Sequence, residues 1–409
     1  MSQPPVPDGA VWIAGDRIRA VGRWPDLKPA RPARVVDLGE VLVLPGLVNA
    51  HCHLDYTDLA GCLPPPRSFT DWIKHITRAK DRWTVEDFRR SWLRGAQMLL
   101  RSGCTAVADV EAVPELLPGC WNGTPLRVIS FLEMTGIRAR RDPRQVLAET
   151  LAVLERLQHP RCSAGLSPHA PYSTRPELLR MAAQEARRRG LRLTIHVAES
   201  EEEFAMFRDA AGPMYDWLLR HERDMQDCGG VSPVQHLHRT SCLGANLLAV
   251  HANCLARGDA ALLARHNVTV VHCPRSHRYF GHPPFPWQRL LRARVRICVG
   301  TDSLASVRGQ GRCRPELSLF DELQELQRTQ PWLSPIRLLR MVTLEPARAL
   351  GLQGRIGELV EGAFADLTVL PGAGVRSARQ AWEAAAAHEG PVESVFIGGV
   401  RVWPTSPRA

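Results

Sequence analysis

Lysine is almost absent from this 409-residue chain, occurring only at positions 28, 74 and 80, so arginine carries nearly all of the net charge of +10. An arginine-rich surface is compatible with nucleic acid, with an anionic small substrate or with neither. No basic run is interleaved with aromatic residues, the pattern typical of surfaces that bind single-stranded nucleic acid. We therefore expect no nucleic-acid partner.

Two further absences bear on the cellular compartment in which the protein works. The 11 cysteines, which run from Cys52 to Cys313, include no C-x-x-C pair, and several lie in apolar segments. This distribution favours buried free thiols over a disulfide framework, which belongs to small secreted chains. No uninterrupted apolar stretch approaches the roughly 20 residues of a membrane span, and the first residues show no leader pattern. We expect a cytoplasmic protein with no membrane partner.

Strand-like and helix-like segments alternate along most of the chain. Apolar residues at three- and four-residue spacing predict helices over 84–101, 143–157, 175–189 and 259–265. The predicted strands are the one ending at His51 and those over 105–110, 127–133, 162–168, 193–196, 247–251, 268–273 and 297–301. This alternation, in a chain long enough for one large and one small domain, predicts an α/β fold with a (β/α)8 TIM barrel.

The two ends of the chain differ from its middle. Residues 10–21 predict a β-hairpin that turns at Gly15 and Asp16, and residues 366–370 and 392–402 predict short strands around turns. Two β-rich ends around a barrel suggest a small discontinuous β-sandwich domain. We expect residues 1–46 and 353–409 to form that domain, and residues 47–352 to form the barrel.

The most informative segment, residues 45–54 (PGLVNAHCHL), is an apolar run that ends in two histidines one residue apart. Residues i and i+2 of a strand project from the same face, so His51 and His53 can bind one metal ion together, while Cys52 points away. Neutral imidazole suits zinc, iron, nickel or copper. Taken alone, the pair has a plain alternative, since two histidines can flank a cysteine by chance.

Three other predicted strands end in residues of the same chemistry. One ends at His196, with Glu199 three residues later, one ends at His251, and one ends at Asp302. The C-terminal ends of all strands in a parallel β/α barrel share one rim, where the active site is built. Because four such endings are improbable as independent coincidences, the sequence predicts a metal site on that rim.

The order of these motifs resembles the amidohydrolase superfamily. The matching segments are PGLVNAHCH, SPHAPYS, TIHVAES, VHANC, HCPRSH, GTDSLAS and residues 354–370 (GRIGELVEGAFADLTVL). More narrowly, the chain is similar to the branch that contains cytosine and guanine deaminases, S-adenosylhomocysteine and methylthioadenosine deaminases, and triazine chlorohydrolases. Residues 131–133, 169–173 and 317–323 look most like the aminodeoxyfutalosine deaminases.

This resemblance implies one divalent metal ion, with zinc favoured over iron, held by His51, His53, His196 and Asp302. The lysine that bridges two metals in binuclear relatives has no counterpart here, because no lysine follows Lys80. Three imidazoles and one carboxylate leave a position for water, whose pKa the metal lowers to about 7.

The resemblance also implies two catalytic side chains beside Asp302. Glu199 would shuttle protons, because it can reach a ring nitrogen of a bound heterocycle, and a low-dielectric pocket would raise its pKa. Its alternative is a first-turn helix carboxylate in the acidic run 199–203. His251 would orient or deprotonate the metal-bound water, with a core histidine as the alternative.

Substrate contacts are expected around the same rim. His169 resembles a substrate-contacting histidine, and Glu133 is a candidate acceptor for a ribose hydroxyl, although it could instead be a capping or salt-bridged carboxylate. Trp72, with Phe69, could stack on a heterocycle or belong to the core.

The loop after the predicted seventh strand departs from the family pattern. Where many relatives carry Ser-Asn, this chain has Ser276 and His277, which leaves the substrate open. The same loop carries Arg275 and Arg278, whose guanidinium groups would suit an anionic substrate. Both arginines could instead be solvated surface groups.

The sequence therefore predicts a mononuclear metal-dependent hydrolase of small molecules. The favoured reaction is hydrolytic deamination of a purine-like nucleoside or related heterocycle through a metal-bound hydroxide. The alternatives are hydrolysis of another C–N or C–Cl bond, as in a chlorohydrolase or a cyclic amidohydrolase, and a non-catalytic protein with the amidohydrolase fold. A homodimer is compatible with the sequence.

Overall fold

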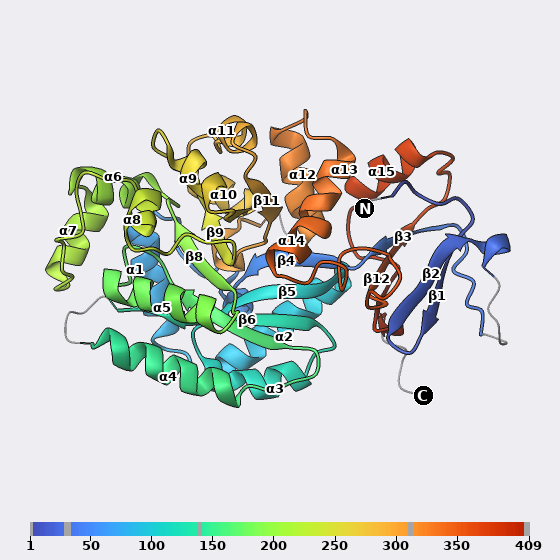
Figure 1. Cartoon of the computed structure of the whole chain (residues 1–409), viewed down its shortest axis with the longest axis horizontal. Helices are drawn as coiled ribbons and strands as arrows, with labels where there is room; N and C mark the ends of the chain where they lie inside the picture. Colours follow the sequence, from blue (N-terminus) through green and yellow to red (C-terminus); the bar gives the residue numbers. More distant parts are fainter. Residues whose placement is uncertain (1–2, 28–33, 137–140, 310–313, 405–409) are drawn as a thin grey trace.

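Eight parallel strands form the centre of the molecule and pair in chain order from β4 to β11 (Figure 1). The computed structural model describes residues 3–27, 34–136, 141–309 and 314–404. The strands are Leu47–Cys52 (β4), Cys104–Glu111 (β5), Arg127–Met134 (β6), Ser163–Pro168 (β7), Leu193–Val197 (β8), Leu247–His251 (β9), Thr269–His272 (β10) and Arg296–Val299 (β11). A parallel bridge between Cys52 and Asp302 joins the last strand to the first. The predicted TIM barrel is confirmed.

Helices surround the barrel, and the four helices predicted from the sequence are confirmed as α2, α4, α5 and α9. The α-helices are Phe69–Lys80 (α1), Val85–Arg101 (α2), Leu117–Asn122 (α3), Pro143–Arg156 (α4), Pro176–Arg188 (α5), Glu201–Asp209 (α6), Pro213–Arg220 (α7), Pro233–Arg239 (α8), Asp259–Arg265 (α9), Pro274–Phe280 (α10), Trp287–Arg292 (α11), Leu319–Thr329 (α12), Pro335–Met341 (α13), Leu344–Ala349 (α14) and Ala378–Ala386 (α15). Short 3-10 turns lie at Trp24–Asp26, Leu54–Leu59, Pro114–Leu116 and Leu304–Ser306.

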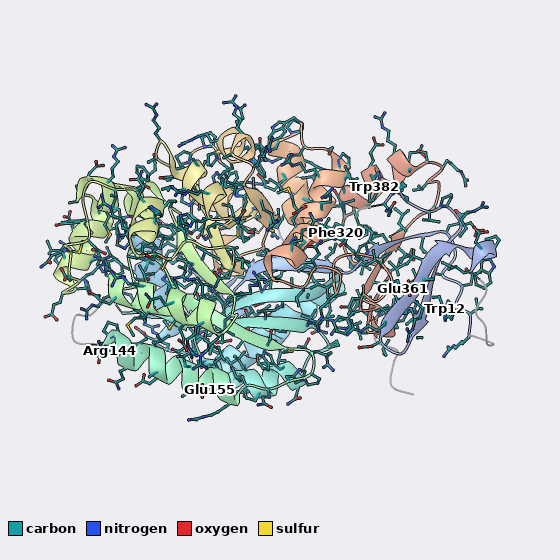
Figure 2. All side chains as sticks on the ribbon, viewed as in Figure 1. Trp12, Arg144, Glu155, Phe320, Glu361 and Trp382 are labelled. Atoms are coloured by element: carbon teal, nitrogen blue, oxygen red, sulfur yellow. The ribbon has the colours of Figure 1, made fainter. Side chains whose placement is uncertain are left out.

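Local sequence explains where the helices begin and which face they bury. Thr84 and Asp87 form a capping box at the start of α2, each side chain accepting a hydrogen bond from the other residue's backbone N–H. Phe320 of α12 is fully buried in the core, whereas Arg144 and Glu155 project from the outer face of α4 (Figure 2). Within the described ranges, no helix has the length and apolar character needed to cross a membrane.

Segments from both ends of the chain build two small antiparallel sheets beside the barrel, on the right of Figure 1. The predicted hairpin is confirmed as Gly9–Ala14 (β1) and Arg17–Arg23 (β2). The second sheet has the order β14-β13-β12-β3 and comprises Val41–Pro45 (β3), Leu367–Pro371 (β12), Ser394–Ile397 (β13) and Val400–Trp403 (β14). The predicted boundaries at residues 46 and 353 stay a prediction.

Strand β3 was missing from the sequence-based prediction. Its apolar residues run directly into β4, with only Gly46 between them, so hydrophobicity shows no break. The change of sheet depends on that glycine, because a Cβ atom there would lie 2.1 Å from Thr105 Oγ1. Gly46 also donates its N–H to the carbonyl of Asp366 across the boundary, at 2.9 Å.

The described cysteines are all free thiols, most of them buried, as the sequence predicted. Cys313 lies outside the described residues. Burial raises the pKa of the Cys104 thiol well above its ordinary value, so this thiol stays protonated and behaves as a small apolar group.

One buried ion pair joins the barrel to the four-stranded sheet. Arg127, at the start of β6, donates from Nε and Nη2 to the two carboxylate oxygens of Asp366, at 2.6 and 3.1 Å. Asp366 also accepts the N–H of Gly398 at 2.8 Å, and the guanidinium lies 3.5 Å from the ring centroid of Phe364. Because both charged side chains are almost fully buried, each depends on the other for compensation.

Replacing Asp366 by Ala should therefore lower the free energy of unfolding by about 3–5 kcal/mol, because Arg127 would retain an unpaired buried charge. Urea unfolding followed by circular dichroism measures this loss. The matched control is Asp16→Ala, which removes an exposed carboxylate 3.5 Å from Arg17 and should change stability by less than about 1 kcal/mol. Equal effects of the two substitutions would contradict the role assigned to the buried pair.

Candidate metal centre and active site

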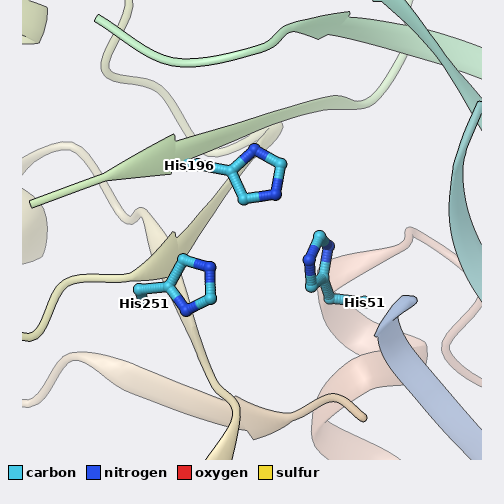
Figure 3. A group of neighbouring side chains, drawn as sticks. All are labelled: His51, His196 and His251. Atoms are coloured by element: carbon cyan, nitrogen blue, oxygen red, sulfur yellow. The ribbon is translucent and has the colours of Figure 1, made fainter. Parts of the chain in front are cut away.

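Three histidines from three strands face one another at the C-terminal rim of the barrel (Figure 3). His51 lies in β4, His196 in β8 and His251 at the end of β9. The ring centroid of His51 lies 4.9 Å from that of His196 and 5.9 Å from that of His251. All three side chains are buried. The strands therefore bring together residues that are up to 200 positions apart in the sequence.

His53 and Asp302 complete the group that the sequence predicted. The Nε2 atoms of His53 and His196 are 3.2 Å apart. Asp302 Oδ1 lies 3.6 Å from His51 Nε2 and 3.8 Å from His53 Nε2. The structure thus places all four predicted metal ligands in one buried cluster, with His251 beside it.

The backbone at this rim is unusual for residues that carry a Cβ atom. Ala198, His251, Ala252 and Asp302 all have positive φ angles, between 50° and 74°. Such left-handed conformations cost free energy and persist where the surrounding structure fixes them, often at functional sites. All four residues lie within three positions of the C-terminal end of a barrel strand, β8, β9 or β11.

The geometry of this cluster fits a metal ion. His196 Nδ1 lies 2.9 Å from the carbonyl oxygen of His169, which can only accept, so Nδ1 carries the proton and Nε2 presents a lone pair. That lone pair points at His53 Nε2, and the buried Nε2 atom of His51 has no hydrogen-bond partner among the described residues. A cation bound between these nitrogens would satisfy them, and a set of nitrogen and oxygen donors suits zinc or iron.

Three overlapping sets of ligand atoms lie within 4.8 Å of one another among the described residues. They are His51 with His53 and Asp302, His51 with His196 and His251, and His251 with Cys273 and Asp302. Burial lowers the pKa of His196 to about 3, with the charges of His169 and His51 as smaller causes, so this imidazole is neutral and free to bind a metal.

Glu199 lies next to the cluster and is held by its main chain. Its N–H donates to Glu203 Oε2 at 2.8 Å, and its carbonyl accepts from Asn253 Nδ2 at 2.9 Å. Its carboxylate Oε1 is 3.4 Å from His251 Nε2. Burial, followed by the charges of Asp302 and Glu203, raises the pKa of Glu199 well above its ordinary value. This carboxyl group therefore keeps its proton to a higher pH than an ordinary glutamate does.

The sequence did not single out Glu203 and Asn253, although both lie in segments that it flagged. Glu203 is fully buried, and burial raises its pKa to about 8. Asn253 Oδ1 lies 3.1 Å from Nδ1 of His277, in the loop that departs from the family pattern. Nothing in the local spacing distinguishes these two residues, because their importance comes from contacts with Glu199.

The predicted substrate contacts lie on several sides of the rim. The His169 ring centroid is 4.8 Å from that of His196, and burial lowers the pKa of His169 to about 3. Glu133 is half-buried near the end of β6. Trp72, on α1, donates from Nε1 to the carbonyl of Ala305 at 3.3 Å.

Four rings form a wall at the mouth of the barrel. Trp72 and Phe69 from α1 contact Phe280 of α10 edge-to-face, each with ring centroids 5.2 Å apart, and His282 lies 5.3 Å from Phe280. Outside this wall is a cavity of about 950 Å³, lined in part by Phe69, Phe280 and His282. Three of the four rings therefore face this cavity.

Arg275 and Arg278 line that cavity, but both are already paired with acidic groups. Arg275 Nη1 lies 3.3 Å from Asp321 Oδ2 and 3.7 Å from Glu322 Oε1. Arg278 Nη1 lies 2.9 Å from Glu325 Oε2. Their charges are thus largely compensated within the protein.

Comparisons with known proteins agree with this geometry. The curated 5-methylthioadenosine/S-adenosylhomocysteine deaminase of Syntrophobacter fumaroxidans is 31% identical over 374 residues, covering 88% of this chain and 80% of that protein. The aminodeoxyfutalosine deaminase of Deinococcus radiodurans is 28% identical over 355 residues, covering 84% and 81%. A crystal structure of an adenosine deaminase from Xanthomonas campestris with bound zinc matches with a TM-score of 0.81 at 24% identity, covering 96% of this chain and 88% of that one.

At 24% identity, the likeness to the Xanthomonas structure supports the barrel fold alone. The sequence evidence goes further, because the model of the amidohydrolase family matches residues 42–402. That span includes the whole barrel and most of the four-stranded sheet. The chain therefore belongs to the amidohydrolase family.

Proposed function

We propose that the chain is a mononuclear metal-dependent deaminase of an adenosine-like nucleoside. The observation that carries this proposal is a buried set of three imidazoles and one carboxylate with a proton-holding Glu199 beside it. The relatives named above, which are deaminases of methylthioadenosine, S-adenosylhomocysteine and aminodeoxyfutalosine, support the substrate class.

His51, His53, His196 and Asp302 would hold the metal ion. A single ion is favoured because the chain has no lysine after Lys80 that could bridge a second one. The zinc bound to the Xanthomonas adenosine deaminase supports zinc over iron. When bound, such an ion lowers the pKa of a water ligand to about 7 and so makes a nucleophile available at neutral pH.

Glu199 would move the protons that deamination requires. A purine ring accepts a nucleophile at its amine-bearing carbon more easily when the adjacent ring nitrogen gains a proton. The raised pKa of Glu199 allows its carboxyl group to donate that proton and then to pass one on to the departing amine. His251, 3.4 Å from Glu199, would orient the attacking water.

The surrounding residues would position the nucleoside. Trp72 and its neighbouring rings offer an apolar face for the base or its substituent. Glu133 lies near the end of β6 and His169 directly follows the neighbouring strand β7, and these residues would contact the ribose hydroxyls and the base edge. Arg275 would meet an anionic substituent only in competition with Asp321.

Purified protein loaded with zinc should release ammonia from at least one of 5-methylthioadenosine, S-adenosylhomocysteine and aminodeoxyfutalosine. The activity should disappear on chelation and return with added zinc, because the hydroxide source depends on the ion. An ammonia-release assay measures this activity, and chloride release from atrazine is assayed in parallel. Chloride release without ammonia release, or an activity indifferent to chelation, would refute the proposal.

Replacing Glu199 by Gln should reduce kcat by roughly 10²-fold or more while metal content stays normal, because the amide keeps the size but cannot shuttle a proton. Replacing His196 by Ala should instead reduce metal content. Metal analysis and steady-state kinetics separate the two effects. The matched control is Glu155→Gln on the outer face of α4, which should behave as wild type. If the Glu199 variant lost metal and the His196 variant kept it, the two roles would be exchanged.

A further inference from the structure

Arg223 is a buried arginine in the segment between α7 and α8, only 6% exposed. Its Nε donates to the carbonyl of Tyr172 at 2.8 Å, and its Nη2 donates to the carbonyl of Pro171 at 3.1 Å and to Asp227 Oδ2 at 2.8 Å. Its Nη1 donates to Asp227 Oδ1 at 2.6 Å and to the carbonyl of Asp224 at 2.7 Å. A guanidinium has five N–H donors, so the described residues account for all of them.

The two carbonyls that Arg223 holds belong to the turn that carries His169. In this turn Ser173 donates its N–H to the carbonyl of Ala170 at 3.1 Å, and Ser173 Oγ lies 2.6 Å from His169 Nδ1. The carbonyl of His169 in turn accepts twice from His196, from its backbone N–H and from Nδ1, both at 2.9 Å. These hydrogen bonds, together with the backbone of residues 169–173, therefore connect the guanidinium to the imidazole of His196.

The contact pattern is specific to a guanidinium. Lysine offers three donors around one atom and cannot hold two successive carbonyls and a bidentate carboxylate in one plane. The pair with Asp227 is nearly buried, so the carboxylate fixes the plane of the fork. A buried ion pair by itself is weak evidence that a residue stabilises the fold. The property that this arrangement determines is the orientation of the turn.

We propose that Arg223 is a positioning residue that fixes the 169–173 turn, so that the carbonyl of His169 keeps Nε2 of His196 directed into the metal centre. The inference rests on the proposed function in one respect, namely that His196 binds the metal. Hydrogen-bond partners of metal-binding histidines set the ring orientation and the protonated nitrogen, and their loss typically weakens metal binding by about 10- to 100-fold.

Zinc affinity of the purified full-length chain, measured by competition with a chelating dye in the absence of any nucleoside, tests this proposal. We expect Arg223→Ala to bind zinc about 10- to 100-fold more weakly than wild type and to show an altered visible spectrum when loaded with cobalt. Added guanidinium ion should restore part of the zinc affinity by occupying the space that the Arg223 side chain leaves, whereas urea should not. The matched control is Arg220→Ala, an exposed arginine at the end of α7, which should leave affinity and spectrum unchanged.

Circular dichroism checks that each variant is folded. If Arg223→Ala does not fold, Arg223→Lys provides the test. Lysine keeps the positive charge but lacks the planar guanidinium group, so this variant should also weaken zinc binding. A folded variant of either kind with wild-type zinc affinity and a wild-type cobalt spectrum would overturn the proposal. A wild-type chain that bound no zinc would instead contradict the proposed function, so the two failures are distinguishable.

Discussion

Two buried imidazole nitrogens, Nε2 of His53 and Nε2 of His196, face each other at 3.2 Å, and this juxtaposition is the constraint on which the rest of the site depends. His196 uses its other ring nitrogen to donate to a carbonyl, so it brings a lone pair to the contact. Burial keeps water from compensating these groups, and burial also lowers the pKa of both rings, which disfavours a proton there. A divalent cation bound between the two nitrogens would accept a lone pair from each, and the nearby carboxylate of Asp302 would balance its charge.

The barrel brings the side chains of that cluster together. Parallel strands end at one rim, so side chains distant in sequence meet there without long loops. The backbone is left-handed at Ala198, His251 and Asp302, a strained conformation that often occurs at functional sites. Around the predicted metal ligands, the His169 carbonyl fixes the ring of His196, and Glu203 and Asn253 fix the main chain of Glu199. Of these neighbours, Glu203 and Asn253 are themselves buried and His169 is half-buried.

Sequence alone predicted the features whose signal is local. Barrel strands appear as short apolar runs, and their ends carry the residues that the structure brings together at His51, His196, His251 and Asp302. The family resemblance is confirmed by the match over residues 42–402. Strand β3 was missed because hydrophobicity continues unbroken into β4, and only the close approach of Gly46 to Thr105 marks the change of sheet. Arg223 and the pairing of Arg275 with Asp321 were beyond sequence reasoning, because they depend on contacts between segments that only the fold brings together.

The location of the metal tests this account most directly, because three overlapping groups of side chains could each bind an ion. Crystals of the zinc-loaded protein, with diffraction recorded on both sides of the zinc absorption edge, give that location from the anomalous difference map. The account predicts one peak, within about 2.0–2.2 Å of His51, His53, His196 and Asp302. Two peaks, or one peak bound by Cys273 and His251 and remote from His53, would contradict it.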